Sequence, residues 1–468
     1  MKIVESRPVN LRILPNRVHR PSPDERADVM IHVPYFVAGI ATVVTAGCLL
    51  GAIALLGVAL NGSYTLAAWT PYIWAHANSQ LFGWVGFFVM GFALQQHAPP
   101  ASKVVAFHRL AYFSLGAMGL GIVLRFIAEP LSRVEPSVWV PVGVGSCILQ
   151  FVAVLAFLYN SSANRHRGTA RPAWQTTFVF SSLVWMALVA AVEPAVFAMT
   201  HGRDSIATVD FVARWFGPLR EAQFLGFVAC MIFGVALVKF HTCFGFRKAD
   251  PRWGLAGWAL WTAGLIARIV GWIVHYEAGL GPSSATLYRA GGVLLALGAA
   301  CVVISLGVFE KFGEAYRSQK FIRAAFGWLL VAGVLLCLEP LHLALLGVPF
   351  SHAYTGAIRH AVTVGFISQM IIGVGLHVAA RMRALDDRVL PALWSVFWLL
   401  NLGNFGRVSL EIATDYSGRA FVPMGATGFI ELAAILVWAR AILGVMFPQW
   451  FAGRRFDRMR LVSEGRHP

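Results

Sequence analysis

The chain has 468 residues, of which 58% are hydrophobic and only 13% are charged, so the composition excludes an ordinary soluble domain and indicates a polytopic membrane protein. The net charge of +16 could suggest nucleic acid, but the basic residues are spread over tails and loops rather than gathered in one groove. Nucleic acid is therefore excluded as a partner, and the lipid bilayer is expected.

Apolar runs predict twelve membrane-spanning helices, each close to the length of about 20 residues that a bilayer core requires. Their expected limits are 33–58, 79–98, 106–130, 138–160, 174–199, 217–240, 254–277, 285–308, 323–347, 357–380, 391–413 and 420–446. Most Lys and Arg lie in the two tails and in loops on the same side, so both termini are expected to be cytoplasmic. Residues 1–32 and 447–468 are read as basic cytoplasmic tails, and residues 33–446 as one membrane domain. The first tail lacks an apolar core and is not a cleaved signal.

One segment recurs three times in the chain, with Gly at its first and ninth positions and Leu at its end. The copies are Gly83–Leu94, Gly226–Leu237 and Gly365–Leu376, which start 143 and 139 residues apart. Arg125, Arg268 and Arg407 each lie 42 residues beyond the first Gly of their copy. The pattern predicts an all-α fold of three pseudo-symmetric four-helix repeats, at about 33–160, 174–308 and 323–446.

Two histidines open equivalent spans in different copies. His76 lies just outside or within the first turn of the second span, and His360 lies at the start of the tenth. Two neutral imidazoles that face each other across a helix bundle suit the axial positions of a low-spin haem iron. The alternative is that both are interfacial histidines bonded to loop carbonyls. We expect the pair to bind haem b.

The three repeat-matched arginines are the second set of candidates, because a buried charge in a membrane is costly and usually functional. Arg125 and Arg407 lie on the same side as the two histidines, where a guanidinium suits a haem propionate. Glu129 and Glu411 follow them by one helical turn, so purely architectural Arg-Glu pairs are an equal alternative. Arg268 has no such acid four residues later, since Trp272 stands there.

The remaining outer histidines form a weaker candidate site. His275, together with His342 and His352 in an expected loop after Glu339-Pro340, could hold copper or a second metal, although no tight spacing supports this. The six cysteines form no CxxC pair, so neither a disulfide framework nor a thiolate zinc site is indicated.

Short motifs give the chain a resemblance to a known family. The stretch HANSQLFG from His76, the stretch RHAVTVGF around His360, Arg125 and twelve spans resemble the NnrS family of haem- and copper-containing bacterial membrane proteins. The architecture more distantly resembles subunit I of haem-copper oxidases. The resemblance implies helices 2 and 10 as sources of the haem ligands, Arg407 as a propionate contact, nitric oxide as a gaseous ligand, and a bacterial inner-membrane location.

Three functions are therefore compatible with the sequence. The first is a b-type haem protein of nitric oxide or nitrosative-stress metabolism, which could turn nitric oxide over as an oxidoreductase. The second is a cofactor-free transporter or channel whose arginines line a path for a small anion. The third is a structural partner subunit of a respiratory complex.

Overall fold

The computed structural model describes residues 29–64, 68–165, 173–201, 205–310, 316–383, 385 and 390–448. Within these ranges the secondary structure is helical, without a β-strand. Most of the two expected tails, 1–28 and 449–468, lies outside the described residues. Eleven of the described helices are long and apolar enough to cross a membrane, so the chain is a multi-pass membrane protein.

The helices follow one another with short connections. The first part of the chain contains α1 (His32–Thr42), η1 (Val43–Gly47), α2 (Cys48–Asn61), α3 (Thr70–Asn78), η2 (Ser79–Gly86), α4 (Phe87–Gln96), α5 (Val104–Leu131) and α6 (Pro136–Ala163). The second contains α7 (Thr176–His201), α8 (Ser205–Glu221), η4 (Ala222–Ala229), α9 (Cys230–Phe244), α10 (Pro251–Glu277) and α11 (Thr286–Leu306). The third contains α12 (Gln319–Leu346), α13 (His352–His360), η5 (Ala361–Ser368), α14 (Gln369–Met382), α15 (Trp394–Thr414) and α16 (Phe421–Met446).

A helix stands at each of the twelve expected places, and α15 is the one that the length and apolarity criteria for a span leave out. Its inner stripe explains this, because Asn404, Arg407 and Glu411 are all buried. Its opposite face carries Leu402 and Phe405, which are 61% and 63% exposed. Polar groups inside and apolar groups outside are what a lipid environment favours.

Several expected loops proved to be helical. α3 begins at Thr70 and α8 at Ser205, well before the expected span starts at 79 and 217. His76 therefore lies in the last turn of α3 rather than at the start of a helix. These segments were missed because their polar residues interrupt the apolar run that marks a span.

The stretch after Glu339 was also predicted wrongly. Pro340 does not end its helix, and α12 continues to Leu346. His342 consequently lies in α12 and His352 begins α13, so neither is in a loop. A proline inside a membrane helix is tolerated because neighbouring groups satisfy the carbonyl that it frees.

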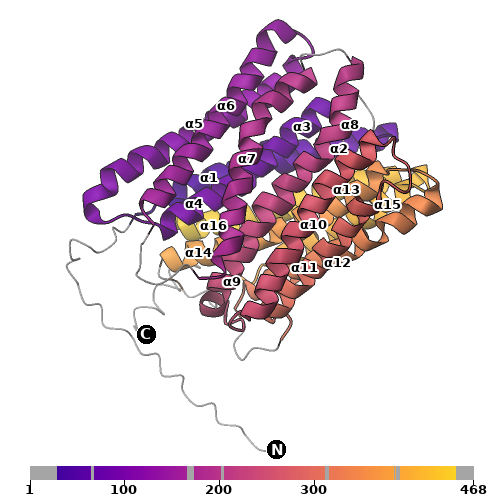
Figure 1. Cartoon of the computed structure of the whole chain (residues 1–468). Helices are drawn as coiled ribbons and strands as arrows, with labels where there is room; N and C mark the ends of the chain where they lie inside the picture. Colours follow the sequence, from indigo (N-terminus) through magenta and orange to yellow (C-terminus); the bar gives the residue numbers. More distant parts are fainter. Residues whose placement is uncertain are drawn as a thin grey trace, which may run out of the picture.

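Three long helices form the centre of the bundle (Figure 1). The most apolar windows of α3–α4, α8–α9 and α13–α14, with their π-helical parts, are 72%, 67% and 72% buried, against 33% to 56% for the other spans. α3, α8 and α13 start at the same end of the bundle, which we call the distal end (Figure 1). The other helices surround this core, and α16 packs against α2.

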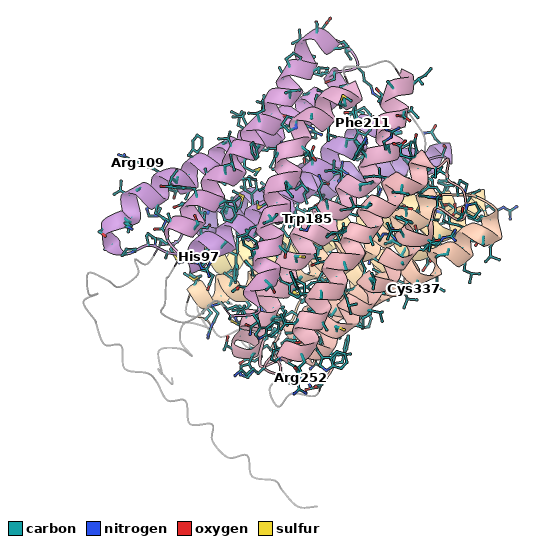
Figure 2. All side chains as sticks on the ribbon, viewed as in Figure 1. His97, Arg109, Trp185, Phe211, Arg252 and Cys337 are labelled. Carbon is teal, nitrogen blue, oxygen red and sulfur yellow. The ribbon has the colours of Figure 1, made fainter. Side chains whose placement is uncertain are left out.

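The repeated segment packs in the same way in all three copies. A Cβ atom on Gly83, Gly226 or Gly365 would lie 2.3 Å from Thr42, 2.7 Å from Trp185 or 2.6 Å from Trp328, respectively. Each contact partner belongs to the first helix of the same copy; Trp185 is labelled in Figure 2, partway along α7. The glycines therefore let each central helix approach its neighbour closely.

Each central helix is π-helical where the repeated segment begins. η2, η4 and η5 are eight residues long, and each starts four residues before the first Gly of its copy. π-helical turns are uncommon and are frequent at functional sites, because they change the direction of side chains. The centre of the bundle near these segments is therefore where a site is expected.

Candidate functional site

The repeat-matched arginines are buried, and each stands in a different polar cluster. Arg125, Arg268 and Arg407 are exposed by 4%, 3% and 6%. We name the Arg125 cluster, the Arg268 cluster and the Arg407 cluster after them, and describe each by its hydrogen-bond and ion-pair partners. Because a buried guanidinium needs both charge and hydrogen-bond partners, these contacts show whether a cluster is complete.

The Arg125 cluster joins two parts of the chain. Arg125 Nε donates to Glu129 Oε1 at 2.6 Å, and its Nη1 lies 3.3 Å from Glu193 Oε2 on α7. His201 Nε2 lies 3.0 Å from Glu129 Oε2, and Gln223 Nε2 donates to Glu193 Oε1 at 2.6 Å. Glu193 is thus held by hydrogen bonds on both oxygens, whereas Glu129 Oε2 and His201 Nε2 are buried without a hydrogen-bond partner among the described residues. The cluster ties α5 to α7.

The Arg268 cluster is equally well paired. Arg268 Nε donates to Glu221 Oε1 at 2.7 Å, and its Nη1 donates to Glu339 Oε2 at 3.1 Å. Its Nη2 hydrogen-bonds to the hydroxyl of Tyr288, and the guanidinium carbon lies 3.9 Å from the centre of that ring. The acids come from α8 and α12, which explains why no acid was needed next to Arg268 in the sequence.

The Arg407 cluster has one acid where the other two clusters have two. Arg407 Nη2 donates to Glu411 Oε1 at 3.0 Å, and His360 Nδ1 lies 3.2 Å from Glu411 Oε2. Arg407 Nε and Nη1 are buried and have no hydrogen-bond partner within the described part of the chain. The expected Arg-Glu pairs of Arg125 and Arg407 are therefore present, but only Arg407 keeps spare donors.

Further unpartnered atoms lie beside Arg407. Asn404 Nδ2 and Oδ1 and Glu431 Oε1 are buried without a hydrogen-bond partner among the described residues. Glu431 lies within electrostatic range of both Arg407 and His360. Buried polar groups are nearly always satisfied in proteins, so such a concentration indicates a place for a bound group or water.

The two predicted haem ligands lie next to this cluster. His76 Nδ1 lies 2.8 Å from the carbonyl oxygen of Gly47, and His360 Nδ1 lies 2.9 Å from that of Gly356. The alternative expectation was that both histidines bond to loop carbonyls, whereas these two carbonyls belong to η1 and α13. A carbonyl only accepts, so each Nδ1 must donate, and each Nε2 carries the lone pair in the neutral ring.

The structure places His76 and His360 near one another in the distal half of the core. They lie within electrostatic range of each other, and His76 is also within that range of Arg407. The His76 ring packs on Gly51, where a Cβ atom would lie 2.5 Å from Cε1. No described side chain hydrogen-bonds to the Nε2 atom of either ring.

The other histidines proposed as metal ligands are separate from one another. His275 Nδ1 lies 2.7 Å from Ser284 Oγ, and His342 Nε2 lies 2.8 Å from Asp415 Oδ2. His352 makes an edge-on contact with a phenylalanine ring. Among the described residues there is no group of three or more His, Cys, Asp or Glu side chains that could hold a metal ion. The structure thus gives the copper hypothesis no support.

Sequence reasoning missed Glu221 as a partner of an arginine and did not assign Glu193 and Glu339 to one. A usable signal existed, because Glu193-Pro194 and Glu339-Pro340 stand at similar places in two copies. What the pattern could not show is that each acid reaches an arginine of the preceding copy.

Comparison of the chain with protein-family models and with curated proteins returns no match. The resemblance to the NnrS family therefore rests on the short motifs alone and stays a prediction. Function must be argued from the polar clusters.

Proposed function

We propose that the chain is a membrane-embedded b-type haem protein in which His76 and His360 hold the iron. The observation that carries the proposal is the arrangement of the two rings: each donates through Nδ1 to a backbone carbonyl, and each Nε2 lacks a described partner. A hydrogen bond from the second ring nitrogen is the usual way in which proteins orient a histidine ligand.

The charge beside the two histidines suits a haem propionate. The spare donors of Arg407 suit a propionate, because a guanidinium binds a carboxylate through two nitrogens. Arg125 and Arg268 are already paired with two glutamates each, so we assign them a structural role.

Each residue of this site has a definite task. His76 and His360 offer Nε2 lone pairs, Gly47 and Gly356 fix the ring orientations through their carbonyls, and Arg407 neutralises an anionic group. A bound haem would supply the capacity to bind a gas and to exchange an electron. By the resemblance of its motifs, we propose nitric oxide as that gas and nitrosative-stress metabolism as the setting.

The proposal also includes the arrangement of the helices. We infer that the helices form three four-helix repeats around a pseudo-threefold axis, which is supported by the matching glycine contacts and the equal placement of η2, η4 and η5. The distribution of Lys and Arg supports cytoplasmic termini in a bacterial inner membrane. The same ring places the core histidines in its distal half.

The arginines do not favour the alternative of an anion channel. Arg125 and Arg268 each contact two carboxylates, so neither presents a free positive charge to a path through the bundle. A conducting route for anions needs exposed cations in sequence along it. We therefore prefer the haem protein.

The absorption spectrum of the purified protein tests the proposal. We expect a Soret band in the wild-type protein, with loss or a shift of this band in His76→Ala and in His360→Ala. His108→Ala serves as a control, because His108 lies in α5 outside the site. A band that is the same in all three variants would remove the ligand assignment, and colourless wild-type protein would remove the haem.

A further inference from the structure

A cavity lies at the distal end of the bundle, and its lining does not include the two proposed haem ligands. Its volume is about 380 Å³, and it is enclosed by α8, α10, α12 and α13, with Trp74 of α3 on one side. Neither His76 nor His360 lines it. The volume lies within the range of small-molecule binding sites, so the cavity can hold an organic ligand.

Three arginines line this cavity, and two of them lack a carboxylate partner. Arg268 is neutralised by its two glutamates, as described above. Arg220 is buried and donates from Nη1 to the neutral amide of Gln223 at 2.6 Å. The guanidinium of Arg359 has no hydrogen bond or ion pair with any described residue. Arg220 and Arg359 also lie close enough to repel each other electrostatically.

This pair of like charges is costly when no anion is present. Both side chains come from central helices, Arg220 near the end of α8 and Arg359 near the end of α13. Glu193 lies within electrostatic range of Arg220, and Glu221, which also lines the cavity, lies within that range of Arg359. Neither carboxylate accepts a hydrogen bond from these two guanidinium groups in the described part of the chain, so a bound anion between them would supply a direct partner and relieve their repulsion. A carboxylate suits two guanidinium groups because each can donate to one or both oxygens.

The walls of the cavity indicate what the rest of the ligand must be. Trp74 and Phe216 form one aromatic pair with ring centres 5.0 Å apart, and Trp272 and Phe350 form another at 5.6 Å. Flat apolar walls of this kind bind planar rings by stacking and by removing apolar surface from water. An inorganic anion would leave most of this lining without a partner.

We propose that this cavity is a binding site for a small aromatic carboxylate, with the carboxylate between Arg220 and Arg359 and the ring between the aromatic walls. The two proposed iron ligands do not line the cavity, although Arg359 directly precedes His360 and Arg220 lies within electrostatic range of His76. The site gives the protein a second, organic ligand that approaches from the distal end.

Equilibrium dialysis of radiolabelled benzoate against the detergent-purified full-length protein tests the proposal. We expect saturable binding that is competed by unlabelled benzoate. Acetate, which keeps the charge without the ring, and benzamide, which keeps the ring without the charge, should each compete at least about tenfold less well. Arg359→Gln and Arg220→Gln should each weaken binding by about tenfold or more, whereas Arg359→Lys should weaken it less.

The test has a matched control variant, Arg289→Gln, and haem absorbance as a second measurement. Arg289→Gln removes an exposed arginine at the same end of the bundle and should leave benzoate binding unchanged. Absence of saturable benzoate binding by well-folded wild-type protein would overturn the proposal. A second result would also overturn it: no benzoate binding by the wild-type protein, together with loss of haem absorbance in Arg359→Gln. The cavity would then bind the haem rather than a second ligand. Loss of the Soret band in the His76→Ala protein with benzoate binding intact would count against the haem alone.

Discussion

The Arg268 cluster and the Arg407 cluster start from the same residue at the same place in two copies, yet they differ in completeness. Arg268 meets two glutamates and a tyrosine hydroxyl. Arg407 meets one glutamate and keeps two buried nitrogens without a described partner. In the first cluster every guanidinium nitrogen is bonded, although Glu221 Oε2 is buried without a described partner. In the second cluster two guanidinium nitrogens remain available.

The difference shows how a repeated structure can acquire a single site. Glu339 reaches Arg268 from the first helix of the next copy, and Glu193 reaches Arg125 in the same way. In the proposed three-repeat arrangement the corresponding neighbour of Arg407 is the first helix of the chain, α1–α2, which packs against α16. That helix contains no acidic residue, so the third arginine lacks its second carboxylate.

The largest expected difference between the two clusters is the loss of stability when the arginine is replaced by alanine. Arg268→Ala leaves two carboxylates buried without their cation, which we expect to lower the free energy of unfolding by about 3–5 kcal/mol. Arg407→Ala leaves one carboxylate beside His360, so we expect a smaller loss of about 1–3 kcal/mol. Thermal unfolding of both variants in the same detergent measures the difference.

The control for this pair is Arg289→Ala, which removes an exposed arginine and should change stability little. If Arg407→Ala were as destabilising as Arg268→Ala, Arg407 would be structural and the contrast between the clusters would be wrong.

The glycines of the repeated segment, by contrast, should lose similar stability in the second and third copies when replaced by alanine. A Cβ atom at Gly226 or Gly365 would lie 2.7 Å or 2.6 Å from a tryptophan ring. We therefore expect Gly226→Ala and Gly365→Ala each to cost about 1–3 kcal/mol of unfolding free energy. Gly116→Ala meets open space and should be neutral or stabilising by up to about 1 kcal/mol. Equal stability of all three variants would show that close packing at the repeated segment is unimportant.

The smallest effects are expected at the histidines outside the Arg407 cluster. His275 hydrogen-bonds to Ser284 and His352 packs against Phe350, and neither is a partner of Arg407 among the described residues. We therefore expect His275→Ala and His352→Ala to leave the absorption spectrum and the metal content of the purified protein unchanged. A loss of bound metal in either variant would revive the second metal site that their positions in the sequence suggested.

Most of the fold could be predicted because apolar runs and topology signals are local properties of the sequence. Eleven helices meet the criteria for a span, and the twelfth, α15, stands at its expected place. The early starts of α3 and α8 could not be predicted in this way, since polar residues interrupt the apolar run there, such as His76 and Asn78 in α3 and the ion pair of Asp210 and Arg214 in α8.

The candidate site was predicted only in part. The spacing from the repeated Gly identified all three arginines, and the positions at two central spans singled out His76 and His360. The partners of these residues lie on other helices, as Glu339 does for Arg268, and tertiary contacts of this kind leave no spacing rule in one sequence. The incompleteness of the Arg407 cluster therefore emerged only when the helices were placed in space.

The central claim is that the third cluster is incomplete because it serves a cofactor held by His76 and His360. Measurement of the haem content of the purified wild-type protein by the pyridine haemochrome method tests this most directly. We predict haem b in at least stoichiometric amount, reduced strongly by His76→Ala. Protein that is well folded, supplied with haem during expression and still free of it would contradict the account.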